Sequence, residues 1–286
     1  MYFWLNQHIN MPHYFKNRKS LTIIMSALLL FPCMYLHGQT PVTATPPPTP
    51  VKPFILVIDA GHGGKDGSTH GLFSKEKDVA LAVALLLGQH IEKESENIKV
   101  IYTRTEDVFI PLYERIEIAN RARADLFISI HCNSMPANMR GRTESRGVET
   151  FVSGAGRVGE QDVAVRENAS ILLEKDYKNN YEGYNPNDPE SFILLSLYKN
   201  AFRKESIRFA RSLQDEYVKS GRVNRDVKMQ SLAVLAKAGM PAVLTEIGFI
   251  SNPSEEEYMN SPAGRQEIVN NITNAIQEYR KRLNAN

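Results

Sequence analysis

The sequence predicts an α/β fold, a single domain in which a twisted, mostly parallel or mixed sheet is flanked by helices. Apolar runs of strand length alternate with longer segments of helical periodicity from residue 54 to the C-terminus. The chain has 286 residues, of which 42% are hydrophobic and 23% charged, the composition of an ordinary globular protein. That length is enough for one large domain with a sizeable core.

The strands and helices are expected in a regular order. Strands are predicted over 54–59, 98–103, 126–131, 147–153, 232–236 and 241–249. Helices are predicted over 74–94, 112–124, 191–220 and 264–283, the first with Ser74 as its N-cap residue. A helical insert near the active site is expected within 154–190, which is longer than a normal strand-to-helix connection.

Charge and cysteine content exclude several classes of protein. The formal net charge is only +2, so the chain lacks the basic excess of a nucleic-acid-binding protein. Its two cysteines, Cys33 and Cys132, cannot form a disulfide framework or a four-cysteine zinc site. The glycines around residues 61–67 match neither a phosphate-binding loop nor a dinucleotide-binding motif, and no G-x-S-x-G elbow is present.

The N-terminus is typical of an exported protein. Three basic residues precede an apolar run over 21–33, which is too short to cross a bilayer of about 30 Å but fits a secretory signal. We therefore expect a signal peptide over 1–38, no membrane span in the mature form, and a location in the periplasm or cell wall. An uncleaved anchor is the alternative. A lipoprotein with Cys33 acylated is disfavoured by Pro32 directly before it, and Met11 is an alternative start.

Residues 39–53 are rich in Pro and Thr and carry almost no charge. Such a segment is typical of a semi-rigid extended linker. It therefore leads from the signal into one folded domain, predicted over 54–286.

Polar residues follow three of the apolar runs. His62 lies in a glycine-flanked turn after the first, His131 ends the run over 126–131, and Glu246 lies near the end of the run over 241–249. Because ligands of open α/β sheets bind outside the carboxyl ends of the strands, these side chains are expected at one sheet edge. Glu76, in the first turn of the predicted helix over 74–94, follows the His62 turn and is the fourth candidate.

Two histidines and one carboxylate with an open fourth position form the catalytic type of zinc site. His62, Glu76 and His131 would supply the ligands, and Glu246 would act as general base and then as general acid. Considered alone, a histidine in the position of His131 is more often structural than a metal ligand, and a carboxylate in the position of Glu76 more often stabilises the start of a helix. Glu246 is harder to explain structurally, since an ionised carboxylate rarely enters an apolar strand without a partner. Cys132 should point away from His131 and is expected to be a small core residue.

The motifs resemble, in order, those of the zinc-dependent N-acetylmuramoyl-L-alanine amidases of the family-3 type. They are IDAGHGGKDGS, KEKDVAL, TRTED, LYERIEIAN, LFISIHCNS, GVETFV and PAVLTEIGFISN, and they span 54–282. The resemblance implies that Zn²⁺ is held by His62, Glu76 and His131, and that Glu246 is catalytic. It also implies hydrolysis of the amide that joins N-acetylmuramic acid to L-alanine of peptidoglycan, in wall remodelling and daughter-cell separation.

The segment over 154–190 resembles the insert of the division-associated members of this family, in which a helix covers the active site until an activator removes it. The resemblance implies a LytM-type activator protein as partner. Among the insert's carboxylates Glu160, Glu167 and Glu174, we expect Glu167 to occupy the open zinc position in the resting enzyme. The alternative is a passive loop that lengthens the substrate groove.

Two other functions remain open from the sequence. The chain would be a non-catalytic wall-binding or division-scaffold protein if it kept the fold without turnover, although the four candidate residues argue against this. The other is a zinc peptidase acting on the same wall, which would differ from the amidase in the products that it releases.

Overall fold

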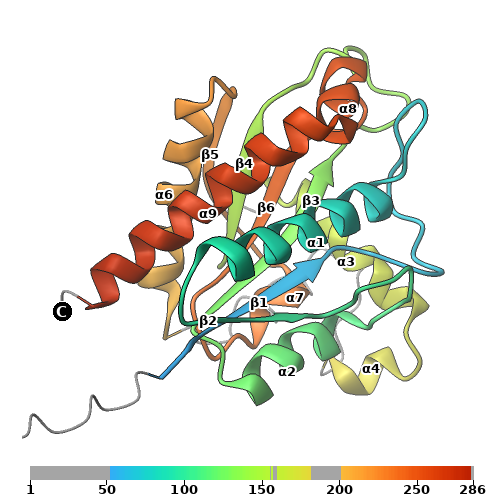
Figure 1. Cartoon of the computed structure of the whole chain (residues 1–286). Coiled ribbons are helices and arrows are strands. Elements are labelled where there is room, and N and C mark those ends of the chain that lie inside the picture. The colour runs from blue at the N-terminus through green and yellow to red at the C-terminus, as the bar shows by residue number, and fades with distance from the viewer. Residues whose placement is uncertain (1–51, 155, 157–159, 182–200, 285–286) are drawn as a thin grey trace, which may run out of the picture. The chain divides into compact units, whose positions relative to one another are not determined.

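The computed structural model describes residues 52–154, 156, 160–181 and 201–284 (Figure 1). The predicted signal peptide over 1–38 and most of the predicted linker over 39–53 lie outside the described residues. So does the part of the predicted insert beyond residue 181. These boundaries, and that of the predicted domain over 54–286, stay predictions.

A six-stranded mixed sheet forms the centre of the fold, with the strand order β2-β1-β3-β6-β4-β5. The strands are β1 (Phe54–Ala60), β2 (Ile98–Tyr102), β3 (Leu126–Asn133), β4 (Val148–Ser153), β5 (Asn224–Gln230) and β6 (Ala242–Phe249). The first four in spatial order are parallel, and β4 then pairs antiparallel with β6 and parallel with β5. The prediction of an α/β domain on a mixed sheet is confirmed.

Helices cover both faces of this sheet (Figure 1). One face packs against α1 (Glu76–Glu94), α6 (Arg203–Lys219), α8 (Pro253–Asn260) and α9 (Pro262–Asn284). The other packs against α2 (Leu112–Ala122), α3 (Asp162–Asn168), the 3-10 helix η2 (Ala169–Leu173), α4 (Tyr177–Asn180) and α7 (Ala233–Ala236). Each face has its own buried apolar cluster, so the central strands are buried on both sides.

The period-two alternation of the strands places the site. On β3, Phe127 faces the cluster beneath α2 and α7, and Ser129 and His131 follow on the same face toward the carboxyl end. On β6, Leu244 belongs to that cluster and Glu246 follows it. Both strands therefore change from apolar to polar at the same edge. Cys132 points to the opposite face and packs in the core, as expected.

Three details differ from the sequence predictions. The run over 232–236 is not a strand but contains helix α7, because a short buried apolar run has no periodicity that separates the two and its alanines favour helix. Strand β5 was missed, since it is polar and lies at the sheet edge. Ser74 is not the N-cap of α1, because the cap position is Lys75 and the Ser74 hydroxyl instead donates to Glu256. The first part of the helix predicted over 191–220 lies outside the described residues, and the described part agrees with α6.

Across the described ranges, no helix is both long enough and apolar enough to cross a membrane.

Candidate metal centre and active site

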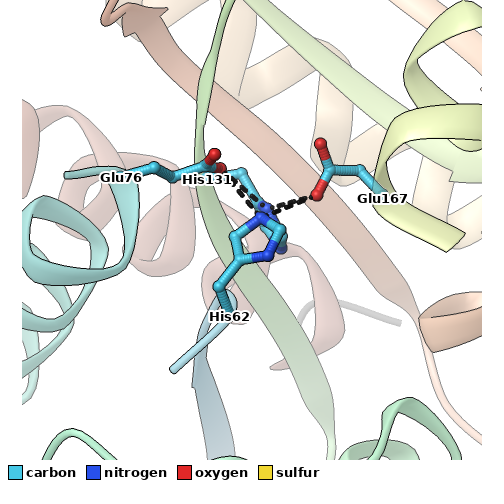
Figure 2. A group of neighbouring side chains, drawn as sticks. All are labelled: His62, Glu76, His131 and Glu167. Carbon is cyan, nitrogen blue, oxygen red and sulfur yellow. Dashed lines mark hydrogen bonds and ion pairs between the residues drawn. The ribbon is translucent and has the colours of Figure 1, made fainter. Parts of the chain in front are cut away.

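Side chains from four separate segments meet at the carboxyl edge of the sheet (Figure 2). His62, Glu76, His131 and Glu167 each bring a donor atom within 4.8 Å of the others. His62 Nε2 is 3.2 Å from Glu76 Oε1 and 2.9 Å from Glu167 Oε2. His131 Nδ1 is 3.1 Å from the same Glu76 oxygen and 2.9 Å from the same Glu167 oxygen. Two nitrogens and two oxygens therefore surround one point.

The backbone after β1 is shaped to bring His62 to that point. His62 has a φ of 57°, in the left-handed region, and Gly63 and Gly64 continue the turn with positive φ. A Cβ on Gly61 would lie 2.5 Å from the His131 ring. Glycine at this position is therefore needed for the two imidazoles to approach each other, with ring centroids 4.8 Å apart.

A second layer of polar groups fixes both imidazoles. The outward nitrogen of His62, Nδ1, is 2.9 Å from Asp66 Oδ2. The outward nitrogen of His131, Nε2, is 3.1 Å from the Ser129 hydroxyl, which donates to Asp59 Oδ2 at 2.6 Å. Asp59 is itself buried and paired with Arg115 at 2.9 Å. Such partners fix the orientation of a metal-binding histidine and leave its other nitrogen free for the ion.

The donor set fits zinc. Ligands about 2.0–2.2 Å from a tetrahedral zinc ion lie about 3.3–3.6 Å apart, a few tenths of an ångström beyond the four nitrogen-to-oxygen distances given above. Among the described residues, His62 Nε2 and Glu167 Oε2 are buried without a hydrogen bond, although they face each other. A cation between these atoms would satisfy both. Mixed nitrogen and carboxylate donors are typical of catalytic zinc sites.

The charges of these groups are strongly coupled. Burial lowers the pKa of both imidazoles, yet the carboxylates of Glu76 and Glu167 raise the pKa of His62 well above its usual 6.5. Glu167 likewise raises the pKa of His131 to about 9. Burial acts to raise the pKa of Glu76, but the charge of His62 holds it below its ordinary value. The carboxylates therefore stay ionised beside cationic partners, a role that a divalent ion can take over from the protons.

Glu246 lies beside this centre without belonging to it. It is the register partner of His131 on the neighbouring parallel strand and is fully buried. Burial raises its pKa to about 8, although the charge of Arg166 opposes the shift. Arg166, from α3, donates to Glu246 Oε1 at 2.9 Å and to Glu167 Oε1 at 2.7 Å. One guanidinium therefore ties the insert helix to the candidate general base.

The family profile of N-acetylmuramoyl-L-alanine amidases matches residues 56–278. The chain belongs to this family. AmiC of Escherichia coli O6:H1 is 32% identical over 230 residues, which cover 80% of this chain and 53% of AmiC. AmiA of Escherichia coli K12 is 29% identical over 234 residues, which cover 79% of this chain and 75% of AmiA. The chain thus spans about half the length of the first relative and three quarters of the second.

Solved amidase structures share the fold. The catalytic domain of the amidase CwlV from Bacillus (Paenibacillus) polymyxa superimposes with a TM-score of 0.58 at 25% identity, covering 80% of this chain and 98% of that domain. An amidase from Clostridium difficile 630 gives a TM-score of 0.59 at 24% identity, covering 81% and 98% respectively. The α/β architecture around the site is therefore that of the amidase catalytic domain.

In this amidase-family chain, the structure brings together residues that the sequence placed far apart. His62, Glu76, His131 and Glu167 converge, and Glu246 lies one strand away. The other acidic candidates of the insert do not join them, and Glu174 instead accepts hydrogen bonds from the Leu112 backbone and the Tyr181 hydroxyl.

Three groups were missed from the sequence. Asp66 follows the glycine turn, Ser129 lies two residues before His131, and Arg166 precedes Glu167. The only sequence signal for Ser129 was its position on the same strand face as His131. Nothing in the sequence indicated that Arg166 would reach Glu246.

Proposed function

We propose that this chain is a zinc-dependent hydrolase that cleaves the amide bond between N-acetylmuramic acid and L-alanine of peptidoglycan. The observation that carries the proposal is the meeting of His62, Glu76 and His131 around one point, with Glu246 buried on the next strand. Membership of the amidase family supports the choice of substrate. The ligand roles of the first three residues, and the catalytic role of Glu246, are part of this proposal.

The chemistry follows from the position of the groups. His62, Glu76 and His131 would hold the zinc ion, which when bound would supply polarisation of the scissile carbonyl and a lowered pKa of a water molecule. Glu246 accepts the proton of the attacking water and donates it to the departing amine of L-alanine. Its burial favours this exchange, because a raised pKa lets the carboxyl hold the proton between the two steps. Asp66 and Ser129 keep the imidazoles aimed at the ion.

We further propose that the insert over 154–190 holds the enzyme in a resting state. Glu167 places one carboxylate oxygen 2.9 Å from both ligand nitrogens, in the position that a substrate oxygen would need. Arg166 neutralises Glu246 from the same helix turn. An activator of the LytM type would then act by drawing α3 away, which frees the metal's open position and the general base together. Wall remodelling and daughter-cell separation are the processes that such control would serve.

The mature protein would work outside the cytoplasm, in the periplasm or cell wall, where peptidoglycan lies. The predicted signal peptide over 1–38 supports this location, and the Pro-rich linker over 39–53 would join it to the domain.

Digestion of purified peptidoglycan sacculi tests the proposed reaction. The full chain, and its Glu167→Ala variant so that a resting enzyme is not mistaken for an inactive one, are incubated with and without a chelator. We expect mass spectrometry to find whole stem peptides beginning with L-alanine, no product with chelator, and recovery on adding Zn²⁺. Fragments cut within the peptide would indicate a zinc peptidase. Absence of any product from both forms would indicate a binding or scaffold protein.

A further inference from the structure

A basic cavity of about 480 Å³ adjoins the candidate metal centre. Thr69 and Arg166 line it, and each also touches the centre: the Thr69 hydroxyl donates to Glu76 Oε2 at 2.8 Å, and Arg166 pairs with Glu246. The cavity therefore opens directly beside the reacting atoms, on the side of the sheet where β4 and β5 follow β6. Three of its lining residues are cations outside the insert: Arg142, Arg225 and Lys228.

These cations are held with their charges only partly compensated. Arg142 donates to the carbonyl oxygens of Met135 and His70, and among the described residues it forms no ion pair with a carboxylate. Arg225 and Lys228 share a single buried carboxylate, Glu149; the Arg225 Nε lies 3.7 Å from it.

The position of Arg225 is also fixed by packing. Its guanidinium lies over the Phe249 ring, 4.8 Å from the centroid, and its buried Nε makes no hydrogen bond within the described part of the chain. A planar guanidinium held on an aromatic face, whose terminal nitrogens make no hydrogen bond among the described residues, is suited to bind a carboxylate.

The insert contributes one carboxylate and one guanidinium to this cavity. Asp162 and Arg166, both from α3, line it together with the three cations. If α3 withdraws as proposed above, the carboxylate of Asp162 and the guanidinium of Arg166 leave together, so the balance of charge in the lining is unchanged. The cavity then presents three cations against the one carboxylate of Glu149, with the Glu246 strand as its inner wall.

The spacing matches a peptide bound across the sheet edge. Glu149 is the antiparallel partner of Glu246, and β5 with Arg225 and Lys228 lies one strand further out. The Arg225 guanidinium reaches back over Phe249, which lies three residues beyond Glu246 on β6, roughly 10 Å along that strand at about 3.3 Å per residue. An extended peptide advances about 3.3–3.6 Å per residue and spans this distance within three residues. A free carboxylate on the second or third residue of the stem peptide would lie within that reach of the scissile amide.

We propose that Arg142, Arg225 and Lys228 form a subsite that binds a free carboxylate of the stem peptide, two or three residues beyond the scissile amide. This inference rests on the proposed function, because it takes the substrate to be peptidoglycan. It makes the enzyme selective for wall peptides with acidic rather than amidated residues at these positions. Glu149 is a positioning residue that keeps Arg225 and Lys228 directed into the cavity.

Binding of product peptides tests the subsite without requiring turnover. Two synthetic stem tripeptides, identical except that one carries free carboxylates and the other carboxamides beyond the first alanine, are titrated by calorimetry into the full chain and into its Glu167→Ala variant. We expect the acidic peptide to bind about tenfold more tightly, the effect of one charge-assisted contact at a partly exposed site. The preference should disappear in Arg225→Gln and in Lys228→Gln.

Three controls keep the result interpretable. Lys99→Gln removes an exposed cation on β2, at the opposite edge of the sheet, and should keep the preference. Lys228→Arg conserves the charge and should restore it. Arg142→Gln leaves the pairs of Glu149 intact, so it tests the subsite even if the other two variants fail to fold.

Equal binding of the two peptides, no binding of either, or a preference that survives in Arg142→Gln, Arg225→Gln and Lys228→Gln would overturn the subsite. A chain that prefers the acidic peptide but hydrolyses no sacculi would retain the subsite and refute the proposed function. The two failures are therefore distinguishable.

Discussion

Removing the Glu167 carboxylate should switch on basal hydrolysis. Glu167 is 3% exposed, lies 2.9 Å from both imidazole nitrogens and accepts from Arg166 at 2.7 Å. Hydrogen bonds to charged groups contribute about 1.5–3 kcal/mol each, so losing this carboxylate should weaken the closed state by at least about 2–3 kcal/mol. Since about 1.4 kcal/mol is a factor of ten, the open fraction should rise about 30- to 150-fold.

The assay is release of dye from labelled sacculi, without activator, by the full chain and by Glu167→Ala. Val165→Ala is the matched control, because Val165 lies on the same helix and 46% of its surface is exposed. Arg166 still pairs with Glu246 in Glu167→Ala, so adding Arg166→Ala should raise the rate further. A rate for Glu167→Ala equal to that of Val165→Ala, with unchanged zinc content and thermal stability, would refute the reasoning and favour a passive loop.

Four other predictions concern the centre and its support. Glu246→Gln should lower kcat about 10²–10⁴-fold, the usual contribution of a general acid–base, with zinc content unchanged; retained turnover contradicts the role. His62→Ala should purify without zinc, as measured by elemental mass spectrometry, and full occupancy would exclude it as a ligand. Ser129→Ala should weaken zinc binding about 10–100-fold in competition with a chromogenic chelator, and unchanged affinity would show that its bond to His131 is dispensable. Glu256→Gln should lower the free energy of unfolding by about 1.5–3 kcal/mol, because the buried carboxylate accepts from the backbone of Leu72, Phe73 and Ser74. Although burial raises the pKa of Glu256, these hydrogen bonds hold the pKa below its ordinary value of 4.5. The stability they contribute is therefore present above pH 4.5 and lost on acidification. The wild type should lose more stability than Glu256→Gln in an acid titration, and parallel curves would contradict this expectation.

The predictions from sequence succeeded where periodicity is strong. The apolar runs that became β1, β3 and β6 are largely buried, so each is recognisable as an unbroken strand, and each carries a polar residue (Asp59, His131 or Glu246) toward its carboxyl end. Those endings predicted the edge at which His131 and Glu246 would lie. The sequence predictions failed for elements that are polar or very short. Strand β5 is a polar edge strand and was not predicted, and α7 is one turn of buried helix that was predicted as a strand.

The contacts that support the candidate metal centre could not be predicted from the sequence. Asp59 and Arg115 pair across 56 residues of sequence, and Arg166 reaches Glu246 across 80. No local propensity or spacing encodes such pairs, because they depend on how α2 and α3 pack over the sheet.

The sequence by itself predicted the fold class and indicated the candidate zinc ligands and the candidate general base, because strand burial and the glycine turn show in local residue patterns. Only the tertiary structure decided which carboxylate of the insert meets the centre, that Arg166 ties it to Glu246, and that three cations from the 135–147 loop and β5 line one cavity beside it. These are contacts between distant segments, and their geometry is set by packing rather than by residue order.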